Sequence, residues 1–279
     1  METGRKYSAR TLLLEVIAVL LALLFLVPFY FVIVNSLKKF ADILKNSASL
    51  PKTVTFDNFT RAWEILEFPK AFTNSLVITI LANVLLALFC SMAAYRLVRH
   101  PSRFNNIVFM AFVAAMVIPF QSIMIPLVRV AANLGLTGNL PGLIICYLGF
   151  GASLTIFLFH GFVKSVPVEV EEAGIMDGCS PFGVFFRIVV PLLKPMIVTV
   201  FILNTLWIWN DFLLPLLIVG GNAELRTIPL ATNAFFSQYT KQWDLALAGL
   251  LMGIAPIIVF FLALQKHIIA GIAAGAVKG

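Results

Sequence analysis

Six long apolar stretches, separated by shorter polar segments, set the pattern of this chain. A hydrocarbon core about 30 Å thick needs roughly 20 helical residues, and each stretch reaches that length. A lipid-exposed strand would leave backbone groups without hydrogen bonds, so helices are expected. The pattern predicts an all-α integral membrane protein with six transmembrane helices, at about residues 11–35, 72–97, 105–130, 140–163, 192–218 and 244–266.

Composition agrees with the membrane prediction. The 279 residues are 61% hydrophobic and only 12% charged, whereas soluble domains are about 45–50% apolar and about 25% charged. Several predicted spans also contain prolines. Neighbouring helices in a membrane bundle can satisfy the carbonyl that a proline leaves free. Bent helices of this kind suit a protein that opens and closes a path; these prolines are Pro28, Pro119, Pro126, Pro215 and Pro256.

Basic residues indicate how the chain is oriented. The first apolar stretch follows Arg5, Lys6 and Arg10 and is longer than the core of a signal peptide, about 7–15 residues, so it is predicted to be an uncleaved span. Six spans put both termini on one side. If that side is the cytoplasm, eleven Lys and Arg lie inside and nine outside. The basic N-terminus favours the same orientation, so both termini are predicted to be cytoplasmic.

This topology divides the chain into four parts. They are an N-terminal segment with the first transmembrane helix (1–35), an extracytoplasmic loop (36–71), a membrane core (72–266) that includes a cytoplasmic loop (164–191), and a cytoplasmic C-terminal tail (267–279). Within the extracytoplasmic loop, apolar side chains at helical spacing predict a short amphipathic helix on the outer membrane surface. These side chains are Phe56, Phe59, Trp63 and Leu66.

Motifs of catalysis and of nucleotide or metal binding are absent from the sequence. It has no GxxxxGK[ST], no HExxH, no CxxC and no basic run of five residues, so we expect no bound nucleotide, no metal and no nucleic-acid partner. Charge in the apolar stretches is scarce, with Glu15 and Asp211 near span ends. Ion-coupled carriers usually keep such groups at mid-depth. Energy for uphill transport is therefore expected from a partner.

The segment from Pro167 to Pro195, PVEVEEAGIMDGCSPFGVFFRIVVPLLKP, carries the most specific pattern. We predict two short helices, at 166–174 and 181–189, joined by a turn at Asp177 and Gly178. An apolar stripe on the second helix is expected to pack on the bundle; it contains Phe182, Phe185, Phe186 and Val189.

The spacing from Glu172 to Pro191 resembles the EAA-x3-G-x9-I-x-LP signature of bacterial ABC importer permeases. Gly174 replaces the second Ala and Val190 replaces Leu. The wider context resembles the carbohydrate-uptake, MalG-like branch of this binding-protein-dependent family. Further similarity lies in the approach to the second span (Pro69 to Leu76), in WNDF at 209–212 and in the tail that ends in GAVKG.

The resemblance implies the type I ABC importer permease fold, in a non-catalytic, multi-pass subunit of a bacterial cytoplasmic membrane. The loop would be the coupling helix that docks on a cytoplasmic ATPase. Its coupling residues would be Glu172, Ala173, Gly174, Asp177, Gly178, Ile188 and Pro191, with Lys278 in the tail as a further ATPase contact. Glu169 and Glu171 are interpreted instead as solvated carboxylates of an amphipathic loop.

The implied partners are a homologous second permease (MalF-like), two copies of an ABC ATPase, an extracytoplasmic solute-binding protein and membrane lipid. ATP and Mg would bind in the ATPase, so no cofactor is expected in this chain. The loops 36–71 and 219–243 are candidate docking surfaces for the binding protein.

Sugar sites combine aromatic faces with amide and hydroxyl groups, which makes the fifth span a candidate substrate path. Its candidate residues are Asn204, Trp207, Asn210 and Asp211. For Trp207 and Trp209 an interfacial aromatic belt is an equal interpretation, and in the resembled maltose system the partner permease makes most sugar contacts. The function predicted is the permease subunit of an ATP-driven sugar importer, with an oligosaccharide as the expected sugar. The alternatives are a stand-alone secondary carrier or channel for a small polar solute, and a membrane enzyme or structural subunit.

Overall fold

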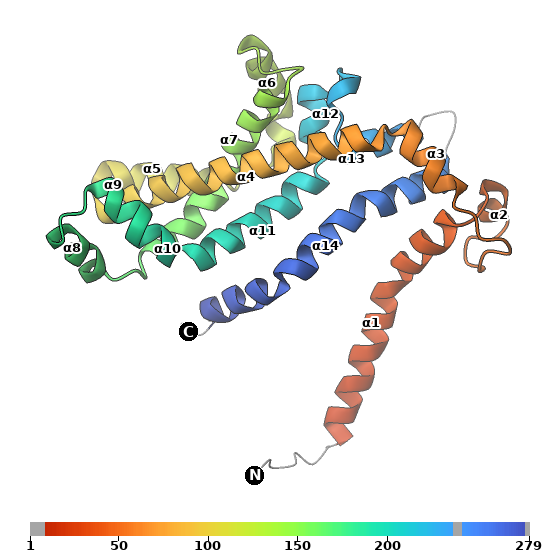
Figure 1. The fold of residues 1–279 in the computed structure, drawn as a ribbon, viewed down its shortest axis with the longest axis horizontal. Helices are drawn as coiled ribbons and strands as arrows, with labels where there is room; N and C mark the ends of the chain where they lie inside the picture. The colour runs from red at the N-terminus through yellow and green to blue at the C-terminus, as the bar shows by residue number, and fades with distance from the viewer. Residues whose placement is uncertain (1–8, 237–241, 277–279) are drawn as a thin grey trace. The chain divides into compact units, whose positions relative to one another are not determined.

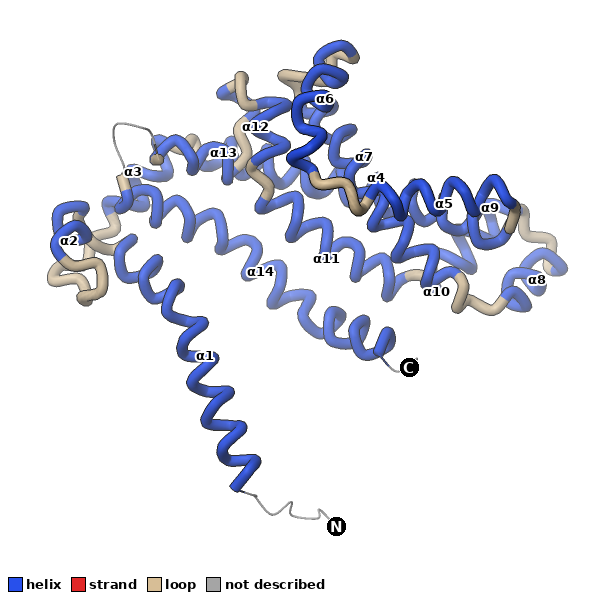
Figure 2. Tube along the Cα trace, turned by 180° about the vertical axis from the view of Figure 1, so that it is seen from behind, coloured by secondary structure: helices blue, strands red, loops and turns tan. Residues whose placement is uncertain are grey.

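The structure is a computed structural model that describes residues 9–236 and 242–276, with side chains as far as residue 263. Helices are the only regular secondary structure in this described part of the chain (Figures 1 and 2). The chain forms two compact units. The first unit contains residues 1–68 and 232–254, and the second contains residues 69–231 and 255–279.

Four described helices are each long and apolar enough to cross a membrane: α1 (Ala9–Ser36), α4 (Phe68–Arg99), α7 (Leu140–Val163) and the Trp243–Ala263 part of α14 (Trp243–Ala276). Two further candidates are bent pairs of helices. The helices α5 (Arg103–Ala115) and α6 (Phe120–Asn133) meet at 108°, and Pro181–Leu192 meets α11 (Lys194–Asn210) at 72°. The described residues therefore provide four spans, or six when each bent pair is one span.

The predicted span at 105–130 is wrong as one straight helix, and the bend falls beside Pro119, one of the prolines expected to bend a span. After α5 ends at Ala115, the chain bends and α6 begins at Phe120. Pro119 lies at the N-cap of α6 in an extended conformation, with φ −63° and ψ 134°. Proline cannot donate to the preceding turn and disfavours helical geometry in the residue before it, so the helix stops there.

The predicted span at 192–218 is also wrong as a single helix. Its start lies in the bend at Leu193, which precedes α11. At its other end, α11 stops at Asn210 and α12 (Leu213–Val219) follows. Asp211 separates them, with an extended ψ of 131°, and its Oδ1 accepts a hydrogen bond of 3.0 Å from the backbone N–H of Leu213. An aspartate that binds the first amides of a helix is an ordinary helix start, which the surrounding apolar run concealed.

In the first unit, a buried lysine holds the segment that follows α1. The side chain of Lys38 is 1% exposed, and its Nζ donates to Asn35 Oδ1 and to the carbonyls of Asn46 and Ser47 at 3.1–3.2 Å. Asn58 Nδ2 donates to the carbonyls of Ser36 and Lys38 at 2.8 and 2.7 Å. These bonds order the loop around α2 (Phe40–Lys45).

The amphipathic helix expected in this loop is confirmed as α3 (Asp57–Ile65). Its neighbour Leu66, from the predicted stripe, is buried. Phe56 and Trp63 are instead 66% and 47% exposed. The stripe is therefore divided between the interior of the unit and its surface. The described part of the first unit also contains the short η3 (Asn233–Phe235).

In the second unit, α4, α7 and α11 form the framework (Figures 1 and 2). Side-chain hydrogen bonds join them in the interior, where Asn204 Nδ2 donates to Thr155 Oγ1 and Asn83 Nδ2 to Thr205 Oγ1, each at 3.2 Å. Such polar contacts join helices within a membrane. The remaining short elements are α8 (Val168–Met176), α9 (Pro181–Val184), η1 (Phe185–Val189), α10 (Val190–Leu192), η2 (Ala223–Leu225) and α13 (Ile228–Thr232).

Candidate functional site

The segment with the EAA-like pattern folds as two helical pieces at the end of the second unit where α4 ends (Figures 1 and 2). The first piece, α8, covers Val168–Met176 and starts two residues after the predicted 166–174, because Pro167 adopts an extended ψ of 134° at its N-cap. The second piece runs without a break through α9, η1 and α10. It extends past the predicted 181–189 and contains one π-helical turn, a feature frequent at functional sites. We call residues 164–191 the coupling loop.

Gly178 makes the turn between the two pieces. Its φ is +84°, the left-handed region that glycine adopts without strain. The N–H of Cys179 donates to the Gly174 carbonyl at 3.0 Å, and the N–H of Gly178 to the Ile175 carbonyl at 2.9 Å. These two bonds are the Schellman pattern of a helix end, so the glycine of the motif terminates α8.

Gly174 lets the two pieces approach each other. A Cβ on Gly174 would lie 2.2 Å from Cδ1 of Ile188, far inside van der Waals contact. Gly174 is buried and Ile188 is partly buried against the surrounding apolar cluster. The departure from Ala at this position therefore makes space for another residue of the same motif.

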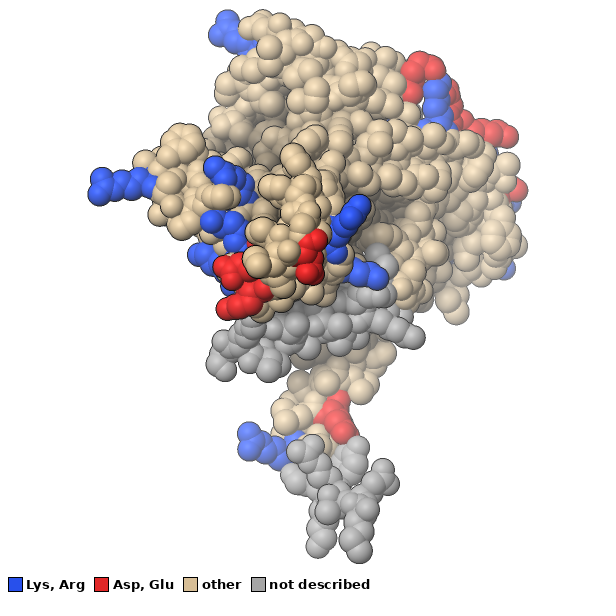
Figure 3. Space-filling model, turned by 60° about the vertical axis from the view of Figure 1, so that its left-hand side comes forward, with Lys and Arg blue, Asp and Glu red and all other residues tan. Residues whose placement is uncertain are grey.

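Most of the other residues predicted to contact an ATPase lie on the outer side of the loop. Glu172, Ala173 and Asp177 are exposed, and Met176 beside them is 87% exposed. Figure 3 shows acidic side chains at this end of the molecule with basic side chains around them. Pro191 is also exposed in α10. The surface combines carboxylates with an apolar side chain, as a protein contact does.

The expected apolar stripe of the second piece packs on the bundle only in part. Phe185 and Val189 are buried at 4% and 0% exposure. Phe182 and Phe186 are 67% and 45% exposed. The two exposed phenylalanines enlarge the outer apolar surface of the coupling loop.

The expectation that Glu171 is solvated is wrong. Its side chain is 6% exposed and pairs with Arg99 of α4 at 2.6 Å, and Tyr95 donates its hydroxyl proton to Glu171 Oε2 at 2.8 Å. Glu169, two residues earlier, is exposed as expected. Positions two residues apart on a helix point about 200° apart, so one acidic run supplies both a buried and an exposed carboxylate.

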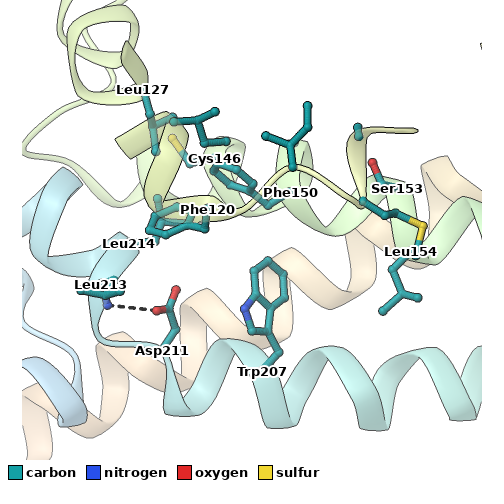
Figure 4. Close-up of a pocket in the computed structure, with 15 residues that line it drawn as sticks. Phe120, Leu127, Cys146, Phe150, Ser153, Leu154, Trp207, Asp211, Leu213 and Leu214 are labelled. Carbon is teal, nitrogen blue, oxygen red and sulfur yellow. Dashed lines mark hydrogen bonds between the residues drawn. The ribbon is translucent and has the colours of Figure 1, made fainter. Parts of the chain in front are cut away.

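A second candidate site is a pocket of about 750 Å³ within the second unit. Its walls come from the bend between α5 and α6, from α7, and from the break between α11 and α12 (Figure 4). Phe120, Phe150 and Trp207 supply aromatic surface, and Ser153 and Asp211 supply polar groups. A large, mainly apolar pocket with few polar groups is typical of small-molecule sites.

Tyr147 of α7 holds the two predicted residues that line this pocket. Its hydroxyl donates to Asp211 Oδ2 at 3.0 Å, and its ring meets that of Trp207 edge-to-face, with centroids 5.4 Å apart. Asp211 is also tied to the Leu213 amide. Both side chains are therefore fixed in place before any ligand binds.

The other candidates for the substrate path lie apart from this pocket. Asn204 is buried and bonded to Thr155. Asn210 is exposed, and its Nδ2 donates to the Leu206 carbonyl at 2.7 Å. The structure thus brings together Trp207 and Asp211 only. Sequence reasoning missed Tyr147, whose phenol within an apolar run was the available signal.

The structure leaves two expectations untested, the ATPase contact at Lys278 and the lack of a metal. Lys278 lies outside the described residues. Among the residues searched, no group of three or more His, Cys, Asp or Glu side chains could hold a metal ion.

Comparison with known proteins assigns the class. Residues 59–273 match the family described as "Binding-protein-dependent transport system inner membrane component", and the chain belongs to this family. It is thus a multi-pass membrane component of a transport system rather than an enzyme. The family match also favours the permease interpretation over a stand-alone carrier.

Named relatives cover nearly the whole chain. The probable starch degradation products transport system permease protein AmyC of Thermoanaerobacterium thermosulfurigenes is 43% identical over 98% of this chain and 99% of its own. The multiple sugar-binding transport system permease protein MsmG of Streptococcus mutans is 39% identical over 92% and 93%. The resemblance to carbohydrate-uptake permeases is thereby confirmed.

A solved structure shares the fold. One chain of a bacterial ABC transporter involved in the import of the acidic polysaccharide alginate superposes with a TM-score of 0.77 at 21% identity. The match covers 94% of this chain and 99% of that one. The fold is therefore that of an ABC importer permease.

Proposed function

We propose that this chain is the permease subunit of an ATP-driven, binding-protein-dependent importer of sugars, with oligosaccharides as substrates. A homologous second permease would complete the path, two copies of an ABC ATPase would supply energy, and a solute-binding protein would deliver the sugar. The relatives named for starch degradation products and for multiple sugars support this substrate class.

The observation that carries the sugar assignment is the pair Trp207 and Asp211 at one pocket wall. Sugars present apolar C–H faces that stack on aromatic rings and hydroxyls that donate to carboxylates. The Tyr147 contacts fix both groups, which lowers the ordering cost of binding. The pocket volume of about 750 Å³ lies within the usual range for ligand sites, about 300–1,000 Å³.

The coupling loop would dock in the ATPase through its exposed residues. Glu172 and Met176 would make contact, while Gly178 and the Gly174–Ile188 contact hold the loop in shape. Closure of the ATPase on ATP would then move α8 and the helices packed on it. The tail with Lys278 would reach the same partner.

In this arrangement both bent helix pairs count as spans, which gives six spans with both termini in the cytoplasm of a bacterial cell. The loops 36–71 and 219–243 would face outward and receive the binding protein. ATP and Mg would be held by the ATPase, and no cofactor by this chain.

The test is uptake by proteoliposomes that contain the assembled transporter, with a loaded binding protein and a panel of maltooligosaccharides. Uptake should require ATP inside and the binding protein outside. Trp207→Ala should reduce uptake by about fivefold or more, because the stacking of a flat ring on an aromatic side chain, as for nucleic-acid bases, contributes on the order of 1–3 kcal/mol, and Trp207→Phe should retain most of it.

As a matched control, Leu203→Ala changes an exposed residue on the same helix that does not line the pocket, and it should leave uptake unchanged. Uptake driven by an ion gradient through this chain alone would reject the proposal. ATP-dependent uptake that Trp207→Ala leaves intact would reject the pocket as the sugar path.

A further inference from the structure

The carboxylate of Glu171 is enclosed on the inner side of α8. Arg99 approaches it from the last turn of α4, with Nε and Nη2 donating to Glu171 Oε1 at 2.9 and 2.6 Å. Tyr95, one turn earlier, donates to Oε2 at 2.8 Å. Both oxygens are thus occupied, and the two charged side chains are 13% and 6% exposed.

The same α4 turn also contacts the segments on both sides of α8. Arg99 Nη2 donates to the carbonyl of Val166 at 2.8 Å, just before α8. The ring of Tyr95 packs against Phe185 of the second piece, with centroids 5.2 Å apart. One turn of a membrane helix therefore touches the start, the first helix and the second helix of the coupling loop.

The opposite face of α8 remains accessible. Met176, about 140° around the helix from Glu171, is 87% exposed, and Glu172, about 100° away, is exposed as well. A partner that binds this outer face leaves the ion pair in place. The buried face can therefore pass a displacement on to α4.

Helix α4 leads from this ion pair into the interior of the second unit. Asn83, on α4, donates to Thr205 of α11 at 3.2 Å. Helix α11 carries Trp207, which lines the pocket. A displacement of α4 thus acts on the helix that bears the pocket residue.

An apolar contact would hold α4 and α8 together at lower cost, because burial of two charges carries a desolvation penalty that their attraction only partly offsets. The ion pair, unlike an apolar contact, fixes how α8 is oriented relative to α4. Two guanidinium N–H groups donate to Glu171 Oε1 while the Tyr95 hydroxyl donates to Oε2. Such charge-assisted hydrogen bonds fix both distance and orientation, whereas apolar side chains can slide.

We infer that Glu171 is a positioning residue for energy coupling, and that its ion pair with Arg99, completed by the Tyr95 hydroxyl, makes α4 move with the coupling loop. The inference rests on the proposed function, because it requires the outer face of the loop to dock on the ATPase. Helix α8 would thus dock on the ATPase with one set of residues and transmit the movement to α4 with another.

The test compares Glu171→Gln with Glu169→Gln in the assembled transporter, in proteoliposomes with a maltooligosaccharide and its binding protein. Each side chain loses its charge and keeps its size, but Glu169 is exposed. The readouts are ATPase co-purification, ATP hydrolysis, and sugar imported per ATP. Glu171→Gln should keep the ATPase bound and active while sugar per ATP falls by roughly tenfold, a typical size for coupling between sites. Glu169→Gln should match the unaltered protein.

Two further variants keep the test independent of folding. The exchange Arg99→Glu with Glu171→Arg should recover part of the lost sugar per ATP. Tyr95→Phe, which leaves the ion pair, should lower the ratio by only about twofold to threefold. An unchanged ratio in Glu171→Gln overturns the inference. Loss of the bound ATPase in that variant also overturns it, because the ion pair would then only shape the docking surface.

A crosslink separates failure of this inference from failure of the proposed function. Met176→Cys in the otherwise unaltered chain should crosslink to a cysteine-bearing ATPase. If it does not, docking by the outer face is wrong, and this inference is overturned with it. A crosslink that forms while Glu171→Gln leaves sugar per ATP unchanged overturns this inference alone.

Discussion

Gly178 shows how one backbone angle determines a functional surface. At φ +84° a side chain strains the backbone, although a Cβ there would meet no atom within 4 Å. Any effect of substitution is therefore conformational and not steric. The turn presents Asp177 and Met176 on the outer face of the loop, so its geometry decides where these side chains lie.

Substitutions at Gly178 should thus follow the tolerance for left-handed backbone, in the order Gly, Asn, Ala, Val. Alanine should cost about 1–2 kcal/mol of loop stability, which lowers the docked population by up to roughly 30-fold. The measurement is ATPase stimulation by the loaded binding protein in each variant.

The matched control is Gly161→Ala, in helix α7, where an added Cβ also meets no atom within 4 Å. It should leave stimulation unchanged, because alanine suits a helix. Equal stimulation by the asparagine and valine variants of Gly178 would contradict the conformational explanation.

At the scale of elements, the breaks in the apolar runs build the pocket. Its walls include the bend before α6 and the break before α12. Asp211 stabilises the second break, since its carboxylate binds both the Leu213 amide and the Tyr147 hydroxyl. A residue predicted as a sugar contact therefore has a structural role as well.

Asp211→Ala should lower the thermal stability of the second unit. It removes the carboxylate that accepts a hydrogen bond from the Leu213 amide, worth about 1 kcal/mol, and leaves the Tyr147 hydroxyl without its partner, at about 1–3 kcal/mol. Asp211→Asn keeps an acceptor oxygen for the Leu213 amide, and its NH2 group can donate to the Tyr147 hydroxyl, which also accepts hydrogen bonds, so this variant should restore most of the stability. Thermal unfolding of the purified permease measures both variants.

If Asp211 also contacts sugar, Asp211→Asn should still raise the sugar concentration needed for half-maximal uptake. Uptake with unchanged sugar dependence in the asparagine variant would leave Asp211 a structural role alone.

The apolar pattern predicted which segments are helical and approximately where they lie, because a helix in lipid must be apolar over most of its length. Pro119 signalled the first break, at 116–119, but the pattern gave neither its sharpness nor the second break, at 211–212, because residues on both sides are equally apolar. The motif spacing placed Gly178 correctly as a turn. It could not distinguish Glu171 from Glu172, since that difference depends on Arg99, which is distant in sequence.

The same limit applies to the pocket. Trp207 and Asp211 were found because their chemistry stands out in an apolar segment. Phe120 and Phe150 were missed, because only packing shows that they share one space with Trp207. Tyr147 was missed although its phenol stands out in an apolar run, because only packing shows that it contacts Asp211 and Trp207.

At the scale of the molecule, the proposed topology places two loops on opposite sides of the membrane: the coupling loop in the cytoplasm and the segment 36–71 outside. Cys179 in the coupling loop is partly exposed, whereas Cys90 and Cys146 are buried. The segment 36–71 contains the exposed Thr53. These positions allow each side of the membrane to be probed separately.

We expect a membrane-impermeant maleimide to label Thr53→Cys in intact right-side-out vesicles and Cys179 only in inverted ones, with the ATPase absent and Cys90 and Cys146 replaced by serine. Labelling of Cys179 from outside would reverse the proposed orientation. Labelling of both positions from the same side would contradict the count of six spans.

The space that Gly174 leaves for Ile188 has a consequence for protein engineering. A relative with alanine at this position would need the end of its isoleucine side chain to lie elsewhere, so the residues at the two positions depend on each other. A chimera that takes only α8 from such a relative would bring a methyl group into the Ile188 side chain. An exchange of ATPase specificity between two relatives should therefore replace both helical pieces together, from residue 168 to residue 192.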